Sequence, residues 1–182
     1  MNIYLLGDFL MLIKIISIIF TILFGTLFHF TYQLTNQNKI IGLFTATNES
    51  TFEHIKMALS ARIFFIPIEI HFMKSYPNYY LSVLIELILI SLFIVLFYYG
   101  YRYFISKKEN TIYNISIFYV SIILSYIIGY KSILYRPIFF FTIHSSFFII
   151  IILLLEIILT IKPLRNFLFI DPITKKYPNF CK

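Results

Sequence analysis

Histidine and carboxylate side chains gather where the first long apolar run of the sequence gives way to the second. His29 lies near the end of the first run, and Glu53 and His54 open the second. Imidazole nitrogens and carboxylate oxygens are ligands that zinc and iron accept in proteins. A zinc or iron site with His29, His54 and Glu53 or Glu156 is therefore one hypothesis, but the spacing is not diagnostic and the sequence contains no H-E-x-x-H motif.

His29, Glu53 and His54 belong to a layer of polar side chains at one depth in the membrane. An α-helix rises about 1.5 Å per residue, so positions in successive apolar runs can be compared by depth. Glu156, near the end of the last run, falls at the level of His29. The candidate functional layer consists of His29, Tyr32, Asn48, Glu49, Glu53, His54, Lys56 and Glu156.

Structural roles compete with the metal hypothesis in this layer. Ser50 followed three residues later by Glu53 has the spacing of a capping box, in which each side chain bonds the other residue's backbone N–H. Capping does not account for His29 or His54. Helix–helix hydrogen bonding is the favoured role for these two histidines, and metal binding and the binding of a ligand or proton are the alternatives.

A second polar layer is predicted nearer the opposite face of the membrane. A charge at the centre of a membrane helix costs about 2.5 to 3.5 kcal/mol, so such groups are expected to pair or to line a wet cavity. Arg62 and Glu69 lie two turns apart on one helix face, which favours a structural ion pair over a ligand or proton pathway. The candidate outer layer consists of Arg62, Glu69, His71, Glu86 and His144.

The elements that must position these layers are membrane helices. Of the 182 residues, 60% are hydrophobic and only 13% are charged, whereas a soluble domain carries about 25% charged residues. Several apolar runs approach the roughly 20 residues needed to cross a bilayer, which predicts an all-α integral membrane bundle of about five transmembrane helices in a single domain. The predicted spans are residues 12–32, 50–73, 80–104, 112–128 and 138–161, followed by a polar tail, 162–182.

The net charge of +7 predicts lipid headgroups, not nucleic acid, as partners, because the basic residues occupy short gaps between apolar runs. With five spans, one side of the membrane gathers Lys39, Arg102, Lys107, Lys108, Lys162, Arg165, Lys175, Lys176 and Lys182. The other side has Lys14, Lys74, Lys131 and Arg136. The richer side should be cytoplasmic. The prediction is a multi-pass protein of the cell membrane with its N-terminus outside and its C-terminus in the cytoplasm.

Three motifs carry a resemblance to a known family. They are Gly25-x-x-x-His29-Phe30-x-Tyr32, Asn48-Glu49-Ser50-x-x-Glu53-His54-x-Lys56 and Asp171-Pro172-x-Thr174-x-x-Tyr177. With them, nearly the whole chain resembles a family of small bacterial membrane proteins classed as a domain of unknown function. The resemblance implies five membrane helices and no established activity. It also implies that the junction between the first and second spans is the place to look for a site.

Three functional hypotheses remain open at this point. The favoured one is a non-catalytic accessory protein or a small-ligand-binding protein with a polar layer facing the cytoplasm, because no set of residues is chemically complete for catalysis. An intramembrane metal-dependent hydrolase or lipid-modifying enzyme is the alternative. A third hypothesis is a transporter subunit, which would require a homo-oligomer or another membrane protein as partner because the chain shows no internal repeat.

Overall fold

The computed structural model describes residues 3–106, 108, 110–136 and 139–178, and within these ranges the chain is helical with no strand. In chain order the elements are α1 (Ile3–Leu34), α2 (Lys39–Gly42), α3 (Thr51–Met73), α4 (Tyr79–Phe104), α5 (Thr111–Ile133), α6 (Phe139–Ile161) and the 3-10 helix η1 (Phe167–Phe169). The predicted all-α fold class is confirmed. Lys107 and Lys182, which the orientation argument counts, lie outside the described residues, as does residue 138, the predicted start of the last span.

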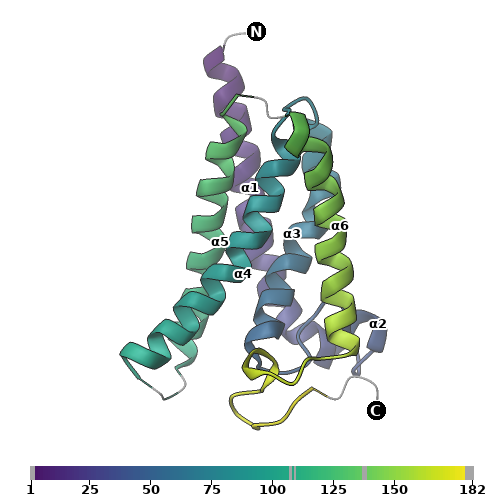
Figure 1. Cartoon of the computed structure of the whole chain (residues 1–182), viewed down its shortest axis with the longest axis vertical. Helices are drawn as coiled ribbons and strands as arrows, with labels where there is room; N and C mark the ends of the chain where they lie inside the picture. The colour runs from purple at the N-terminus through teal and green to yellow at the C-terminus, as the bar shows by residue number, and fades with distance from the viewer. Residues whose placement is uncertain (1–2, 107, 109, 137–138, 179–182) are drawn as a thin grey trace.

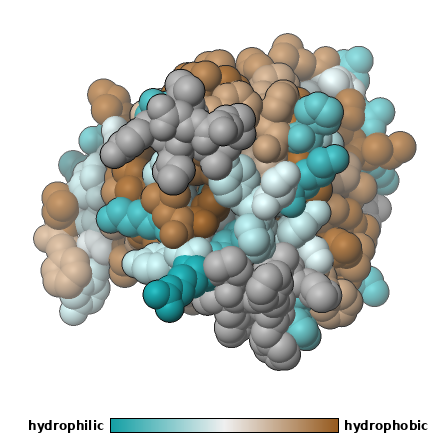
Figure 2. Space-filling view, turned by 90° about the horizontal axis from the view of Figure 1, so that it is seen from above, coloured by the Kyte–Doolittle hydropathy of each residue, from teal (hydrophilic) through white to brown (hydrophobic). Residues whose placement is uncertain are grey.

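The long helices run side by side along the length of the molecule, as Figure 1 shows. The described chain begins at the upper end of that view, whereas α2, η1 and the C-terminal tail lie at the lower end. Seen from above in Figure 2, hydrophilic residues are scattered across the end face and hydrophobic ones occupy much of its rim. That distribution is typical of a bundle whose sides face lipid and whose ends face water.

Four helices are long and apolar enough to cross a membrane. They cover Gly7–Leu34 in α1, all of α4 and α5, and His144–Ile161 in α6. Their outward surfaces carry half-exposed apolar side chains such as Leu23, Leu92 and Leu154. A surface of this kind is stable against acyl chains and not against water. The chain is therefore a multi-pass helical membrane protein.

The remaining long helix, α3, turns its charged face toward the other helices, while Phe64, Ile68 and Phe72 on its outer face are 44 to 50% exposed. It packs against α1, α4, α5 and α6, and its 23 residues span about 34 Å at 1.5 Å per residue. Its hydropathy is lowered by charged residues whose side chains are buried. The packing of this face into the bundle explains how α3 carries them without exposing them to lipid.

Two helices extend beyond the ranges predicted from hydropathy. Helix α1 begins at Ile3, before residue 12, and α5 continues to Ile133, past residue 128. The backbone of α5 keeps its hydrogen bonds until Leu134, which caps it. A hydropathy run ends where polar residues begin, whereas a helix ends where its backbone bonding ends, so the two boundaries need not coincide.

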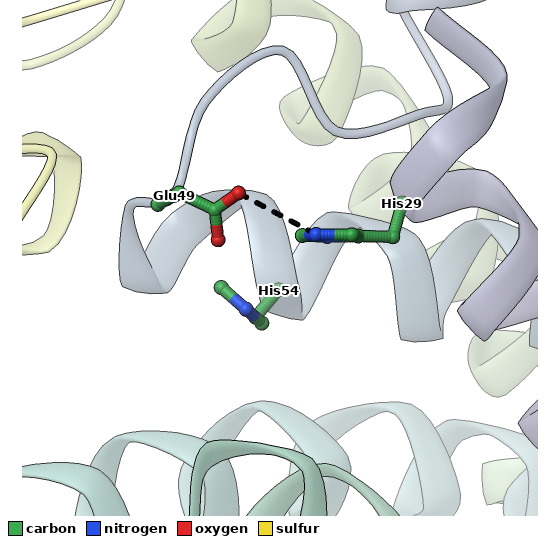
Figure 3. A group of neighbouring side chains, drawn as sticks. All are labelled: His29, Glu49 and His54. Atoms are coloured by element: carbon green, nitrogen blue, oxygen red, sulfur yellow. Dashed lines mark ion pairs between the residues drawn. The ribbon is translucent and has the colours of Figure 1, made fainter. Parts of the chain in front are cut away.

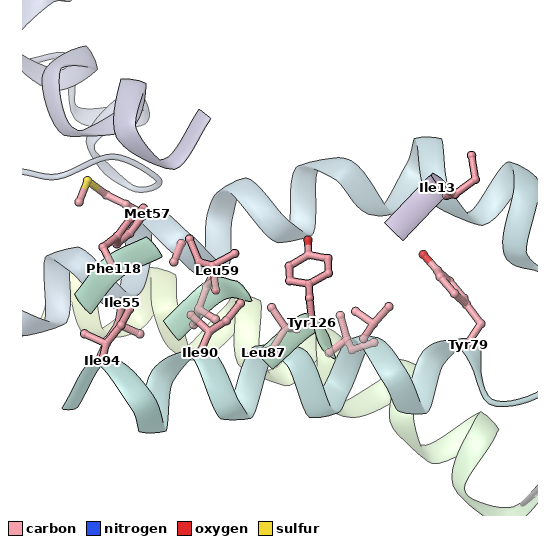
Figure 4. Close-up of a cluster of buried hydrophobic side chains, with 14 of the residues drawn as sticks. Ile13, Ile55, Met57, Leu59, Tyr79, Leu87, Ile90, Ile94, Phe118 and Tyr126 are labelled. Carbon is pink, nitrogen blue, oxygen red and sulfur yellow. The ribbon is translucent and has the colours of Figure 1, made fainter. Parts of the chain in front are cut away.

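Apolar side chains from α1, α3, α4 and α5 form the core between the helices. Ile90, Val83, Ala58 and Ile122 are completely buried. Figure 4 shows this cluster running along α4, with the Tyr126 ring pointing from α5 into the bundle. In the membrane such packing supplies close van der Waals contact, since acyl chains are as apolar as the core itself.

Four charged side chains meet within the bundle, in the half nearer the chain's start, and are called here the buried charge cluster: Lys14, Arg62, Glu69 and Glu86. The Lys14 ammonium lies 3.0 Å from Glu69 and 2.7 Å from Glu86. The Arg62 guanidinium lies 2.6 Å from Glu69 and 2.7 Å from Glu86. Lys14 is 3% exposed and the other three are completely buried. Two cations and two anions cancel, so the cluster is neutral.

Neutral polar groups complete the buried charge cluster. The Tyr79 hydroxyl donates to Glu69 and the Ser82 hydroxyl donates to Glu86. The Tyr126 ring lies under the Arg62 guanidinium, 5.1 Å from ring centre to Cζ, within the range of a cation–π contact. The cluster therefore joins α1, α3, α4 and α5 at one level.

Removing one cation from the buried charge cluster should destabilise the protein strongly. Lys14→Met leaves an uncompensated negative charge, which costs about 3 to 5 kcal/mol when one partner of a buried pair is lost. The exposed Lys74→Met is the matched control and should change stability by less than about 0.5 kcal/mol. Thermal unfolding in detergent measures both. Equal melting temperatures for the two variants would contradict the structural role given to Lys14.

Candidate functional site

The chain between α1 and α3 folds back along the end of α1. Asn36 and Gln37 adopt positive φ angles of 52° and 59°, which turn the chain sharply. Asn38 then caps α2 by accepting the N–H of Ile40 at 2.9 Å. Further along, the Ala46 N–H donates to a carbonyl of α1 at 3.2 Å. These bonds place residues 47–50 beside the last turns of α1.

The start of α3 is fixed by a set of bonds that differs from the predicted capping box. Ser50 is the N-cap residue, but its side chain makes no capping bond. The Ser50 N–H donates to the Asn48 carboxamide at 2.8 Å. The Glu53 carboxylate instead accepts the Thr47 N–H at 2.7 Å. The capping-box prediction is therefore wrong, because Asn48 has taken the N–H that Glu53 would have bonded.

Glu53 is also paired with Lys56 one turn later on α3. The two charges are 2.7 Å apart and both side chains are buried. The Lys56 ammonium donates in addition to the Gly42 carbonyl at 3.0 Å. This pair fastens the end of α2 to α3. Glu53 consequently lies outside the histidine pair with which the sequence grouped it.

Glu49 lies where Glu53 was expected, beside His29 and His54, and these three residues are called here the histidine cluster. His29 Nε2 lies 3.4 Å from a Glu49 oxygen, and one ligand atom from each residue lies within 4.8 Å of the other two. Figure 3 shows His29 reaching from α1 to Glu49 in the loop, with His54 beside them on α3. All three side chains are partly exposed.

A backbone bond orients His54 within the histidine cluster. His54 Nδ1 lies 3.0 Å from the Ser50 carbonyl oxygen, which can only accept, so Nδ1 carries the proton in this contact. That tautomer leaves Nε2 with a free lone pair. A metal-ligating histidine commonly donates its other ring N–H in this way.

The histidine cluster has a donor set suited to zinc or a similar transition metal. A tetrahedral zinc with N and O ligands at about 2.0 to 2.2 Å holds those atoms about 3.4 Å apart. The His29–Glu49 distance already has that value, whereas the widest separation in the cluster, up to 4.8 Å, would have to shorten. Half-exposed side chains can make such a movement without repacking the core. Three ligands would leave a fourth position open.

The histidine cluster lies at an apolar pocket of about 350 Å³ between α1, α3, α5 and the tail. His29, Glu49 and His54 all line it. Its other walls come mainly from Phe30, Ile115, Phe118, Tyr119 and Ile173. A small apolar cavity with a few convergent polar groups is the usual form of a ligand site.

Gly25 sets the close approach of α5 to α1 at this pocket. A Cβ atom on Gly25 would meet the Phe118 ring at 2.8 Å, closer than real Cβ contacts allow. Glycine therefore lets the aromatic ring of α5 lie directly against the α1 backbone. Phe118 then forms one wall of the pocket.

A second pocket has a volume of about 340 Å³ and is lined mainly by polar residues. Several of these residues are neighbours, in the sequence, of residues that line the first pocket. Tyr32, predicted for the site, lines the second pocket together with Asn48. The tail contributes Asp171, Thr174, Lys176 and Tyr177. The predicted candidates Tyr32 and Asn48 therefore belong to this polar pocket and not to the histidine cluster.

The tail is held against the start of α3 by stacking and by hydrogen bonds. Phe169 stacks on Phe52 with 4.4 Å between ring centres. The Asp171 carboxylate accepts the N–H groups of Ile173 and Thr174 at 2.8 and 2.9 Å. The same carboxylate lies 3.5 Å from the Glu49 N–H. The tail thus supports the backbone that carries one of the three candidate ligands.

The other predicted residues lie away from the histidine cluster. Glu156 is buried in α6 and accepts the Ser60 hydroxyl. In the outer layer, Arg62, Glu69 and Glu86 meet in the buried charge cluster, which also includes Lys14. His71 and His144 are exposed and do not join it. Lys14 was missed because a lone lysine in an apolar run resembles a flanking charge.

Comparison with known proteins shows the family to which the chain belongs. The model of a family of unknown function, DUF6512, matches residues 9–178. The chain belongs to DUF6512. All three motifs that carried the resemblance lie within the DUF6512 match, and most of their residues line the two pockets described above, whereas Ser50, Glu53 and Lys56 do not. No curated protein and no solved structure matches the chain.

The attachment of the tail should weaken in acid. Burial opposes ionisation of Asp171, but backbone N–H donors from Thr174, Ile173 and Glu49 outweigh it and hold the pKa of this carboxyl below its ordinary value. A depressed pKa stabilises the attached tail at neutral pH, and this stabilisation is lost as the pH falls through the native pKa. The protection of the Ile173 and Thr174 amides against hydrogen exchange, measured relative to the intrinsic rate at each pH, should therefore fall in acid.

Asp171→Asn should show the faster exchange already at neutral pH, because the amide cannot carry the charge that these donors stabilise. The exposed Asp8→Asn is the control and should behave like the wild type. Tail amides whose protection in the wild type does not change between neutral and acidic pH would contradict this role of Asp171.

Proposed function

We propose that this protein binds a transition metal, zinc or iron, at His29, Glu49 and His54, and through it a small ligand in the adjoining apolar pocket. The convergence of two imidazoles and one carboxylate on one pocket is the observation that carries the proposal. The hydrogen bond from His54 Nδ1–H to the Ser50 carbonyl supports it, because this tautomer leaves the lone pair of His54 Nε2 available to a metal.

Ligand binding is favoured over hydrolysis because the nearby carboxylates are engaged in other bonds. A metal hydrolase needs a general base within reach of the metal-bound water. Glu53 is held by Lys56 and the Thr47 N–H, and Glu156 is buried against Ser60. Neither lines the pocket, so among the described residues the pocket has metal ligands but no spare carboxylate.

The charged side chains within the bundle also argue against a transport path through one copy. Arg62 pairs with two carboxylates and is completely buried. A path for ions or solutes requires polar groups facing water. The buried charge cluster is better explained as a support for the helices around the site.

Metal content should depend on the histidine cluster. The detergent-purified protein should contain about one zinc or iron per chain, the stoichiometry of a three-residue site with one open position. His29→Ala, His54→Ala and Glu49→Gln should each lose most of it, as measured by elemental analysis. His71→Ala and Glu53→Gln are the matched controls.

His71→Ala should keep its metal because that histidine is remote from the cluster. Glu53→Gln should also keep metal in the folded fraction but unfold at a lower temperature, because Lys56 loses its partner. The proposal would be overturned if the wild-type protein contained no metal after the cells had been grown, and the purified protein dialysed, with added zinc or iron. A loss of metal in Glu53→Gln but not in Glu49→Gln would also overturn it.

We also propose that the end of the bundle bearing the histidine cluster faces the cytoplasm. The excess of lysine and arginine at that end supports this orientation. Alkaline phosphatase fused after Ser75 should then be active, and the same reporter fused after Lys108 or at the C-terminus should be inactive. A green fluorescent protein fusion should give the opposite pattern, and the reverse result for both reporters would refute the orientation.

A further inference from the structure

We infer that the ligand is a phosphate-bearing membrane lipid: its phosphate lies at the histidine cluster, an acyl chain fills the apolar pocket, and the rest of its headgroup occupies the polar pocket. This inference rests on the proposed metal site and names its ligand class. It follows from the way in which neighbouring residues line the two pockets, from where the apolar pocket opens, and from the charge of the metal site.

Neighbouring residues of the same three segments line the two pockets. In the loop before α3, Asn48 lines the polar pocket and Glu49 lines the apolar one. In the tail, Ile173 lines the apolar pocket and Thr174 the polar one. Near the end of α1 the pair is His29 and, one turn later, Tyr32. A single molecule with one apolar end and one polar end would fit such an arrangement.

The apolar pocket opens toward the lipid-facing surface between α1 and α5. Phe30 on α1 and Ile115 on α5 both line it, yet they are 56% and 48% exposed. Both residues belong to helices that qualify as membrane spans. Phe30 lies four residues before the end of α1, about 6 Å along the axis. A lipid could therefore enter sideways from the bilayer, at the depth where acyl chains meet headgroups.

The charges around the polar end favour phosphate. A divalent metal held by two neutral imidazoles and one carboxylate keeps a net charge of +1 and an open position for an anionic oxygen. In the polar pocket the Lys176 ammonium is balanced by the Asp171 carboxylate, so the net positive charge of the site comes from the metal. The pocket also offers the amide groups of Gln33 and Asn48 and the Tyr177 hydroxyl. These groups suit a phosphate ester with a polar headgroup.

A free phosphate is a weaker candidate because it would use only half of the site. It would leave the apolar pocket, with its aromatic and aliphatic walls, without an occupant. The volume of about 350 Å³ is within the range of pockets that enclose small molecules, about 300 to 1,000 Å³. A lipid uses both pockets and the opening between α1 and α5.

Photo-crosslinking in vesicles tests this inference. The full chain, loaded with zinc, is reconstituted into phosphatidylcholine vesicles that contain a small fraction of phosphatidylglycerol with a diazirine in its acyl chain. Crosslinks should map to the α1 and α5 walls of the apolar pocket. Ile115→Trp narrows the opening and should lower the crosslink yield by about tenfold, which corresponds to about 1.4 kcal/mol of binding. Ile123→Trp, on the exposed face of the same helix but outside the pocket, is the matched control.

The headgroup half of the site has its own pair of variants. Lys176→Gln should reduce the preference for phosphatidylglycerol over a diazirine-labelled diacylglycerol, which lacks the phosphate. Lys175→Gln, beside it but outside the pocket lining, should not. Inorganic phosphate that displaces the lipid at millimolar concentration would overturn the lipid assignment. Equal crosslinking in Ile115→Trp and Ile123→Trp would overturn it as well.

Zinc content, measured on the same samples, separates this inference from the proposed function. Metal-loaded protein without specific crosslinks leaves the metal site intact and removes the lipid. Protein that binds no metal fails the proposed function. If that metal-free protein still captures the lipid at the pocket walls, the coordination of phosphate by metal is overturned.

Discussion

Charges enclosed in a membrane protein must cancel locally, and this constraint determines how the helices of this bundle can be arranged. Lys14, Arg62, Glu69 and Glu86 come from three different helices and are buried together. Rotating any of these helices would separate an ion pair in a medium of low dielectric constant, where the loss is large. Helix α5 also packs closely against the cluster. A Cβ atom on its Gly129 would meet a Glu86 oxygen at 2.6 Å, so only glycine leaves room for this carboxylate.

The buried charge cluster holds the helices together at one level, and the candidate site lies nearer the other end of the bundle, where α2 and the tail are found (Figure 1). Helix α3 contributes to both, since Arg62 lies at its midpoint, Glu69 in its second half and His54 in its first turn. Its first turn is anchored by the Glu53–Lys56 pair and by the bonds around Ser50. The half-exposed histidine cluster is therefore built on a rigid base. Such a base is what a metal site needs if its ligands are to move only slightly on binding.

The sequence predicted the helices well because the bilayer imposes a length and a composition on every span. The depths of the polar residues and the family resemblance also pointed to the junction of α1 and α3 as the place to look for a site. Hydropathy could not predict partners, because these depend on rotation about each helix axis and on the path of the loop. Glu49 and Glu53 are four residues apart, yet only the folded loop brings Glu49 to the histidines. His71 and His144 have the depth of the outer layer but face outward.

The position of the tail has a consequence for how the protein is made. Ribosomes deliver the chain from its N-terminus, so His29, Glu49 and His54 enter the membrane long before residues 171–174 exist. The walls that the tail supplies to both pockets arrive last, and the stacking of Phe169 on Phe52 can form only then. Domains generally fold in the order of their synthesis. In this protein the helices can therefore assemble during translation, whereas the walls of both pockets are completed only after residues 171–178 have been made.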